Sequence, residues 1–197
     1  SYLERQNSSL VAMLNSFIQK SVSEFSGFYL HEHEKLLQDI ETCKKLSNKK
    51  IVLWGVSFAL LDLAEKFKPD LNDCLVFETG GMKGRRKEVT RQELHGHLKG
   101  YFNIDNVYSE YGMTELLSQA YIREGDLFTP PPWMKVVVRE VVDPFEKGQI
   151  NRNGGLNVID LANFHSIAFI ETEDAVKVYA DGSFEVMGRL DNSDVRG

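Results

Sequence analysis

"KKIVLWGVSFALLDLAEKF", Lys49 to Phe67, changes its pattern of apolar residues partway along, and this change decides the fold class. Ile51 to Trp54 is a short continuous apolar run of the kind found in buried strands, and Gly55 breaks it. Ser57 stands where its side chain could cap a helix that continues to Phe67. The stretch therefore predicts a buried strand that leads directly into a helix.

The same succession of strand and helix recurs further along the chain. "DCLVFETGG", residues 73–81, predicts a buried strand ending in glycines, and "TRQELHGHLKGYF", residues 90–102, predicts a helix. Thr90 could cap that helix, with Glu93 completing a capping box. A third strand is expected near residues 106–109. This alternation favours an α/β fold with a parallel sheet flanked by helices, and such sheets bind ligands beyond the carboxyl ends of their strands.

The segments on either side have other patterns. Apolar residues recur every three or four positions from Leu10 to about Phe25, and a second helical pattern runs from near residue 34 to 46. After "TPPPW", residues 129–133, short apolar runs between glycine and aspartate turns predict an antiparallel sheet or partial barrel from Lys135 onward. We expect an α/β nucleotide-binding subdomain over residues 1–128 and a smaller β-rich subdomain over 129–197.

Composition excludes several classes of protein. The formal charge of -6 argues against a nucleic-acid partner. No apolar run approaches the roughly 20 residues that cross a bilayer, and the start does not resemble a signal peptide, so we expect a cytoplasmic protein. Cys43 and Cys74 are too few for a disulfide scaffold, and Cys74 is expected to be a buried thiol. Because the chain starts at Ser1 and stops at "DVRG", we expect a piece of a longer protein.

Three polar loops follow the three predicted parallel strands: "WGVS" (54–57), "ETGG" (78–81) and "SEYGMTE" (109–115). Paired glycines let the backbone come close to a flat ring or a phosphate. Tyr111 could stack on that ring, Thr114 could donate to a phosphoryl oxygen, and Glu115 is a hard oxygen ligand suited to Mg²⁺. Any one of these loops alone is more often a plain strand ending.

The order of three motifs suggests a family. "YSEYGMTE" (108–115), "FIETED" (169–174) and "GRLDNSDVRG" (188–197) resemble successive signatures of the adenylate-forming enzymes: acyl-CoA synthetases, luciferases and nonribosomal adenylation domains. Within that superfamily, "SYLERQNSSL", "LWGVS", "ETGGMKGRR" and "EYGMTEL" most resemble the acyl-protein synthetases of the bacterial bioluminescence fatty-acid reductase complex, relatives of phenylacetate-CoA ligase. The resemblance covers essentially the whole chain.

The resemblance implies a role for each matching residue. It implies ATP and Mg²⁺ as cofactors, with the nucleotide bound by Glu78, Thr79, Gly80, Gly81, Tyr111, Gly112, Met113 and Asp174. The adenine would lie between the loop 78–81 and Tyr111, and Asp174 would grip the ribose hydroxyls. The catalytic residues would be Thr114 at the α-phosphate, Glu115 as the Mg²⁺ ligand, and Arg189 near ribose and phosphate. Trp54, Gly55 and Val56 would sit near the acyl pocket, and Asp191 would be the hinge of a carboxyl-terminal lid.

The implied reaction is attack of a carboxylate, expected to be a fatty acid, on the α-phosphorus of ATP, followed by transfer of the acyl group to a thiol. Positioning, a magnesium ion and cationic side chains would stabilise the transition state. The implied partners are a protein thiol or a reductase complex. An aryl- or acyl-CoA ligase of the phenylacetate-CoA ligase type, or a non-catalytic docking module of an acyl-transfer complex, stays open as an alternative.

Several departures from the family pattern stand beside the resemblance. The chain lacks the upstream glycine- and serine/threonine-rich phosphate loop, and "GGMKGRRK" lacks the ending of a Walker loop. The lid with its catalytic lysine is not part of it either. Glu173 stands where many relatives have glycine, and neither Cys43 nor Cys74 matches the acyl-carrying cysteine. We therefore expect half of a site and no activity from this segment alone.

Three further features allow two interpretations each. The basic run Lys83, Arg85, Arg86 and Lys87, together with Arg91, could attract phosphate or form an ordinary solvated loop. "HEH", with His31 and His33, could chelate zinc but has no third ligand nearby in sequence. Trp133 could pack on the β-rich region or mark a partner surface.

Overall fold

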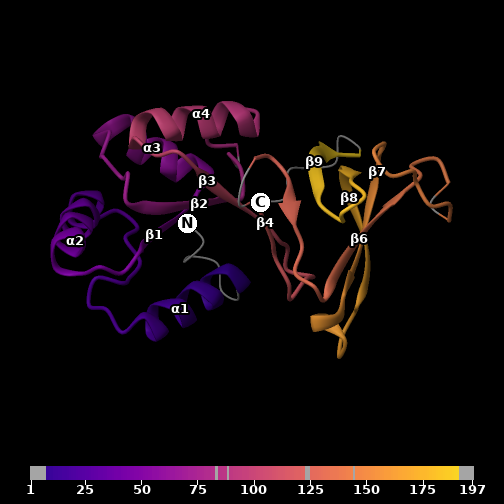
Figure 1. The fold of residues 1–197 in the computed structure, drawn as a ribbon, viewed down its shortest axis with the longest axis horizontal. Coiled ribbons are helices and arrows are strands. Elements are labelled where there is room, and N and C mark those ends of the chain that lie inside the picture. The colour runs from indigo at the N-terminus through magenta and orange to yellow at the C-terminus, as the bar shows by residue number, and fades with distance from the viewer. Residues whose placement is uncertain (1–7, 83, 88, 123–124, 144, 191–197) are drawn as a thin grey trace.

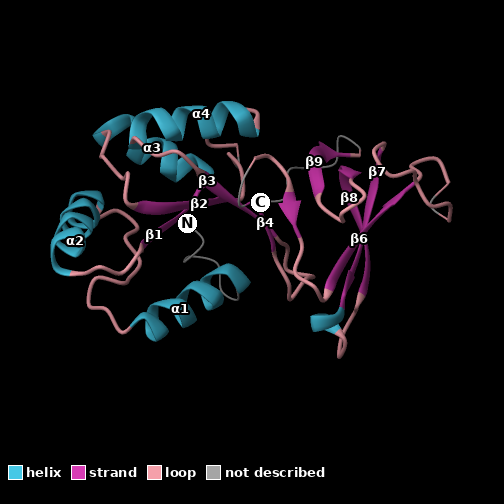
Figure 2. Ribbon diagram, in the orientation of Figure 1, coloured by secondary structure: helices cyan, strands magenta, loops and turns pink. Residues whose placement is uncertain are grey.

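The computed structural model describes residues 8–82, 84–87, 89–122, 125–143 and 145–190. In one half, helices pack on part of the sheet, and the other half consists mainly of strands (Figures 1 and 2). The helices are α1 (Ser9–Ser21), α2 (His33–Leu46), α3 (Ser57–Phe67), α4 (Arg91–Phe102) and a short 3-10 helix, η2 (Leu161–Asn163). The strands are β1 (Ile51–Val56), β2 (Cys74–Thr79), β3 (Val107–Tyr111), β4 (Ala120–Ile122), β5 (Phe128–Thr129), β6 (Met134–Arg139), β7 (Asn153–Asp160), β8 (Phe169–Val178) and β9 (Phe184–Arg189). Within the described part of the chain, no helix has the length and apolarity to cross a membrane.

One sheet runs through both halves in the order β1-β2-β3-β4-β5-β9-β8-β7-β6. β1, β2 and β3 are parallel, and the remaining neighbours pair antiparallel. β1 and β6 are its edges, so the sheet is open. The predicted α/β class with an antiparallel β-rich region is confirmed, and this region continues the parallel sheet instead of closing into a barrel. β4 and β5, which join the two parts, were not expected from the sequence.

The starts of α4 and α3 are built differently. α4 begins with the predicted capping box, because the Thr90 hydroxyl accepts from the Glu93 amide at 3.2 Å and the Glu93 carboxylate accepts from the Thr90 amide at 2.8 Å. The prediction that Ser57 caps α3 is wrong. Ser57 is the first residue of the helix, makes no cap hydrogen bond, and donates its hydroxyl hydrogen to Glu78 instead.

The ends of α1 also differ from expectation. The Ser8 side chain caps the helix, accepting from the Val11 amide. The helix ends at Ser21, before the predicted Phe25, because Val22 takes a left-handed conformation with φ 51 that cannot continue it. The apolar pattern continues past the point where the backbone turns, and this explains the longer prediction.

Two hydrophobic cores lie in series along the sheet. The first packs α3 and α4 on one face of β1, β2 and β3, and it contains the buried thiol of Cys74, as predicted. The second lies in the β-rich half and is centred on Leu156, Val176 and Phe184. The cores meet within β3, since Val107 belongs to the first and Tyr111 to the second. The subdomain boundary at residue 128 stays a prediction.

Candidate functional site

The loops after β2 and β3 lie side by side, because the two strands are parallel and Glu78 pairs with Ser109 in their register. Gly80 and Gly81 follow β2 with φ of 80 and 63, a conformation that favours glycine. A side chain at Gly81 would meet no atom within 4 Å, so the backbone here faces open space. The C-terminal edge of the parallel strands therefore presents the exposed glycine backbone that the sequence predicts for a nucleotide loop.

Glu78 anchors this loop from beneath. Its side chain is buried and accepts hydrogen bonds from the hydroxyls of Ser57 (2.7 Å) and Ser109 (2.5 Å). Since Ser109 gives its hydrogen to Glu78, His95 Nε2, 3.0 Å from the Ser109 oxygen, is the donor in that contact. The Ser57 hydroxyl also accepts from the Gly81 amide at 3.1 Å. The network joins α3, β2, α4 and β3, and it leaves the loop backbone, rather than the Glu78 carboxylate, to face a ligand.

The charge of Glu78 is set by two opposing effects. Burial raises the pKa of this carboxyl, but the neighbouring His95 ring, 3.6 Å away, and the hydrogen bonds from Ser109 and Ser57 outweigh burial and hold the pKa below its usual value. Glu78 is therefore ionised at neutral pH. Its negative charge is held inside the first core and serves the loop as a fixed support.

A second cluster connects the end of β3 with the β-rich half. The Tyr111 hydroxyl donates to Asp174 Oδ2 at 2.6 Å, across 63 positions of sequence. Arg189 approaches the other oxygen of Asp174 at 3.8 Å and pairs with Glu173. The predicted ribose residue, the predicted ring-stacking residue and one predicted catalytic residue are thus brought together.

The Tyr111 ring lies deeper than the stacking prediction requires. It is 9% exposed and packs edge-to-face against Phe128 and Phe184, with centroids 5.7 and 5.3 Å away. Arg91, which lies near the basic run, places its guanidinium carbon over the Phe128 ring, 4.7 Å from the ring centroid. In this structure the Tyr111 hydroxyl connects β3 to Asp174 of β8. Stacking of adenine on the Tyr111 ring stays a prediction.

The segment 112–115 carries the remaining predicted residues at the surface. Gly112, Thr114 and Glu115 are exposed, and Met113 packs against the second core. The segment that follows is tied down by Asp160, which is fully buried. Its carboxylate accepts from the amides of Leu117 and Ser118, both at 2.9 Å, and from the Ser118 hydroxyl at 2.6 Å.

Two other side chains secure the same segment. Asn163 donates to the Glu115 carbonyl at 2.6 Å. Trp133, which is half exposed, donates its indole hydrogen to the Ser118 hydroxyl at 2.9 Å. Trp133 is therefore part of the support of this loop. The sequence analysis did not predict roles for Asp160 and Asn163. The aspartate at the end of the apolar run "NVID" is the sequence feature that could have indicated Asp160.

The predicted Mg²⁺ site at Glu115 stays a prediction. Among the described residues, no group of three or more His, Cys, Asp and Glu side chains could hold a metal, and His31 and His33 make no zinc centre. Magnesium commonly uses one or two carboxylates, with phosphate oxygens and waters as its other ligands. Glu115 is exposed and could supply one such carboxylate.

The face of the sheet opposite α3 and α4 is aromatic. The rings of Trp54, Phe77 and Tyr108 stack in sequence across β1, β2 and β3, at centroid distances of 4.5 and 4.9 Å. Tyr121 of β4 meets both Trp54 and Phe77 edge-on, at 6.2 and 6.1 Å. α1 lies on this side (Figure 1), with Phe17 6.4 Å from Trp54.

Part of this face opens into a cavity of about 860 Å³ between the sheet, α1 and α2. Trp54, Phe77, Leu75 and Ile40 are among its lining residues. Of the residues predicted for the acyl pocket, Trp54 lines the cavity. Gly55 faces the other way, because a side chain there would meet Leu60 of α3 at 2.6 Å.

Glu110 is a candidate that sequence reasoning missed. It alternates with Ser109 and Tyr111 on β3 and so lies on the aromatic face, opposite Tyr121 in the register. Its Oε2 is buried without a hydrogen-bond partner among the described residues. Burial and the nearby charge of Glu78 raise the pKa of Glu110 to about 7. A charged residue between Tyr108 and Tyr111 was the signal in the sequence.

The basic run is largely engaged in structure. Arg86 pairs with Asp62 and Glu65 of α3, and Arg85 lies over the Phe58 ring at 4.9 Å. Lys83 and the predicted hinge residue Asp191 lie outside the described residues. Arg85 and Arg86 therefore hold the loop that follows β2 against α3.

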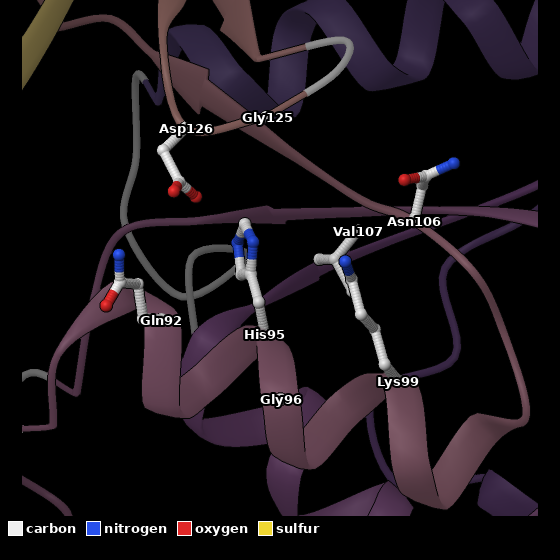
Figure 3. Close-up of a pocket in the computed structure, with 8 residues that line it drawn as sticks. All are labelled: Gln92, His95, Gly96, Lys99, Asn106, Val107, Gly125 and Asp126. Carbon is white, nitrogen blue, oxygen red and sulfur yellow. The ribbon is translucent and has the colours of Figure 1, made fainter.

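A smaller hollow of about 380 Å³ lies on the α4 side of the sheet (Figure 3). Gln92, His95 and Lys99 project from α4 toward it, and Asp126 points in from the opposite wall. It contains none of the predicted site residues. The glycine loop and the aromatic face, rather than this hollow, carry the candidate site.

The fold matches those of several solved enzymes. No family model matches the chain, and no curated protein matches it. The luciferase-like enzyme from the mealworm Zophobas morio is similar over 82% of this chain and 41% of its own, with TM-score 0.56 and 20% identity. An open conformation of 2-hydroxyisobutyryl-CoA ligase, in complex with 2-HIB-AMP and CoA, is similar over 86% and 39%, with TM-score 0.64 and 14% identity. ATP-bound MatB from Rhodopseudomonas palustris is similar over 80% and 33%, with TM-score 0.57 and 15% identity.

These likenesses show that the chain shares its fold with part of each of these solved enzymes. The chain spans about two fifths or less of the length of the solved structures it matches. A specific likeness to acyl-protein synthetases or to phenylacetate-CoA ligase stays a prediction.

Proposed function

We propose that this chain is part of an ATP-dependent ligase that activates a fatty carboxylate as its acyl adenylate and passes the acyl group to a protein thiol. The observation that carries the proposal is the hydrogen bond from Tyr111 to Asp174. It joins the end of a parallel strand to the β-rich half at the edge where the glycine loop opens. One ligand could therefore touch the residues of all three motifs.

Each predicted residue would contact a different part of the nucleotide. The backbone at Gly80 and Gly81 would lie against the adenine, while Asp174, held by Tyr111 and Arg189, would accept from the ribose hydroxyls. The Thr114 hydroxyl would donate to the α-phosphate, and the Arg189 guanidinium would offset negative charge there. Glu115 would hold Mg²⁺, which polarises a phosphoryl oxygen when bound. The remaining groups would come from the rest of the longer protein.

The 860 Å³ cavity beside the aromatic face is the feature that favours a substrate with an apolar acyl group. Its lining continues from Trp54 and Phe77, near the C-terminal ends of the strands, toward Ile51 and Leu75 nearer their starts. A carboxylate placed at the glycine loop could direct its chain along that path. The flat stack of Trp54, Phe77 and Tyr108 also favours a second candidate, an aryl-CoA ligase. The thiol acceptor, coenzyme A or a protein cysteine, separates the two.

Carboxylate-dependent exchange of pyrophosphate into ATP, measured on the full-length protein, tests the proposal. Exchange should depend on added carboxylate and Mg²⁺ and should fall at least about 100-fold in Asp174→Ala and Glu115→Ala. The exposed Asp105→Ala is the matched control and should keep full exchange. If no carboxylate supports exchange, or both site variants match the control, the chain is not the nucleotide side of a ligase, and a docking role gains.

A further inference from the structure

The aromatic face holds two buried polar atoms without hydrogen-bond partners among the described residues: Glu110 Oε2 and Trp54 Nε1. A buried polar atom without a partner is unfavourable, and native proteins keep few of them. Both atoms belong to the face that the proposed function assigns to the acyl group. The fold keeps an acceptor and a donor on an otherwise apolar, stacked surface, and a bound ligand would satisfy them.

Glu110 lies at the reacting end of this face. The register aligns Glu78 with Ser109, so Glu110 is level with Thr79, the last residue of β2 before the glycines. A side chain on Gly112 would come within 3.4 Å of Glu110 Oε1, which places the carboxylate beside the start of the 112–115 segment. The cavity lining, in contrast, continues past Phe77 to Leu75 and away from this edge. A group that reaches Glu110 therefore sits near the carboxyl end of an acyl substrate and not along its tail.

We propose that the acyl substrate carries a hydrogen-bond-donating substituent, a hydroxyl or amino group, close to its carboxylate, and that Glu110 accepts the hydrogen bond from it. This inference rests on the proposed function and narrows its substrate class. An unsubstituted alkyl chain would leave Glu110 Oε2 buried and unpaired in the complex, whereas a hydroxyl or amino group would satisfy it. Trp54 Nε1 offers a donor to an oxygen or nitrogen acceptor on the same face.

Glu110 has the properties of a specificity residue. Its second oxygen is not consumed by any of the networks that hold the loops, which use Glu78 and Asp160. Its partner in the register is Tyr121, whose side chain carries no positive charge at any pH, so this neighbour does not neutralise Glu110. A site that must hydrogen-bond a substrate group discriminates strongly against analogues that lack it.

The test is pyrophosphate exchange by the full-length protein with matched acids of one chain length: unsubstituted, 2- or 3-hydroxy, and 2- or 3-amino. The wild type should show kcat/KM at least about 10-fold higher for a hydroxy or amino acid than for the unsubstituted acid. Glu110→Leu should lose that preference by slowing the substituted acid and sparing the plain one. Glu110→Gln, which keeps an acceptor oxygen, should retain part of it. Glu140→Leu, an exposed carboxylate of the β-rich half, is the matched control.

The outcomes separate the two proposals. If the wild type prefers the unsubstituted acid, or Glu110→Leu slows all acids equally, the inference is overturned while the ligase function stands. If no acid of the series supports exchange, the proposed function itself fails. Thermal unfolding of each variant shows whether it is folded, and Glu110→Leu should melt no lower than the wild type because it removes a buried unpaired carboxylate.

Discussion

At the scale of single residues, Glu110 has a measurable signature that does not depend on a substrate. Burial and the charge of Glu78 raise its pKa from 4.5 to about 7. A carboxyl with a raised pKa in the folded protein contributes stability that is complete below the unfolded value and is lost as pH rises through the folded value. At about 1.4 kcal/mol per pKa unit, the loss is at most roughly 3 kcal/mol, and partial solvent access reduces it.

The prediction is that wild type loses stability relative to Glu110→Gln between about pH 4.5 and pH 7. Of the neighbouring titratable groups, Glu78 is already ionised over this window and Tyr121 stays neutral. Urea unfolding of both proteins at several pH values measures the difference. Equal pH dependence of the two proteins would show that Glu110 titrates normally.

Asp160 gives a second prediction at this scale. Its two oxygens accept from four donors: the amides of Leu117, Ser118 and Ala162, and the Ser118 hydroxyl. An asparagine would turn its amide hydrogens toward at least one backbone N–H, so Asp160→Asn should cost roughly 2–3 kcal/mol. Amide exchange at Leu117 and Ser118 should speed up as well. The exposed Asp105→Asn serves as control, and equal melting temperatures for the two variants would contradict the role given to Asp160.

At the scale of elements, the turn from β1 into α3 depends on Gly55. A side chain there would lie 2.6 Å from Leu60 Cδ2 and 2.7 Å from its Cγ, and Leu60 is a core residue that is 3% exposed. Gly55→Ala should therefore destabilise the fold by about 1–3 kcal/mol. Gly96→Ala on the open surface of α4, where nothing lies within 4 Å, should be neutral or stabilising. Thermal unfolding compares them, and a Gly55→Ala melting temperature equal to that of the wild type would refute this packing.

The junction of α3, β2 and the glycine loop depends on Ser57. Ser57→Ala removes a donor to the buried Glu78 and an acceptor for the Gly81 amide, at a cost of about 1–3 kcal/mol. Because hydrogen bonds hold the pKa of Glu78 low, their stabilisation exists above the unfolded pKa and is lost as pH falls through the folded one. The loss of unfolding free energy in Ser57→Ala, relative to the wild type, should thus be larger near neutral pH than in acid. A deficit independent of pH would mean that Ser57 does not support the charge of Glu78.

Periodicity predicted the elements that bury one clear face. β1, α3, β2 and α4 were expected where they lie, because apolar runs and the capping box are local signals. β4 and β5 were not, since strands of three and two residues carry no measurable period. Ser57 was assigned to a cap because the local pattern allows it, while a buried carboxylate on another strand took its hydroxyl.

At the scale of the whole molecule, the candidate site depends on contacts between distant segments. The motifs placed Tyr111 and Asp174 at one ligand, and the structure joins them by a hydrogen bond. Glu110 and Asp160 could not be assigned from the sequence, because their roles follow from what the other half of the sheet places around them. One sheet runs through both halves, and Tyr111 on β3 and Asp174 on β8, 63 positions apart in sequence, come within hydrogen-bonding distance.

The most direct measurement of the central claim is hydrogen exchange of the full-length protein with and without ATP and Mg²⁺. The account predicts slower exchange in three segments together: the loop at Gly80 and Gly81, residues 111–115, and the strand around Asp174. Glu115→Ala and Asp174→Ala should abolish this joint protection, while Asp105→Ala should keep it. Protection confined to one segment, or none in the wild type, would contradict a single nucleotide site at this edge of the sheet.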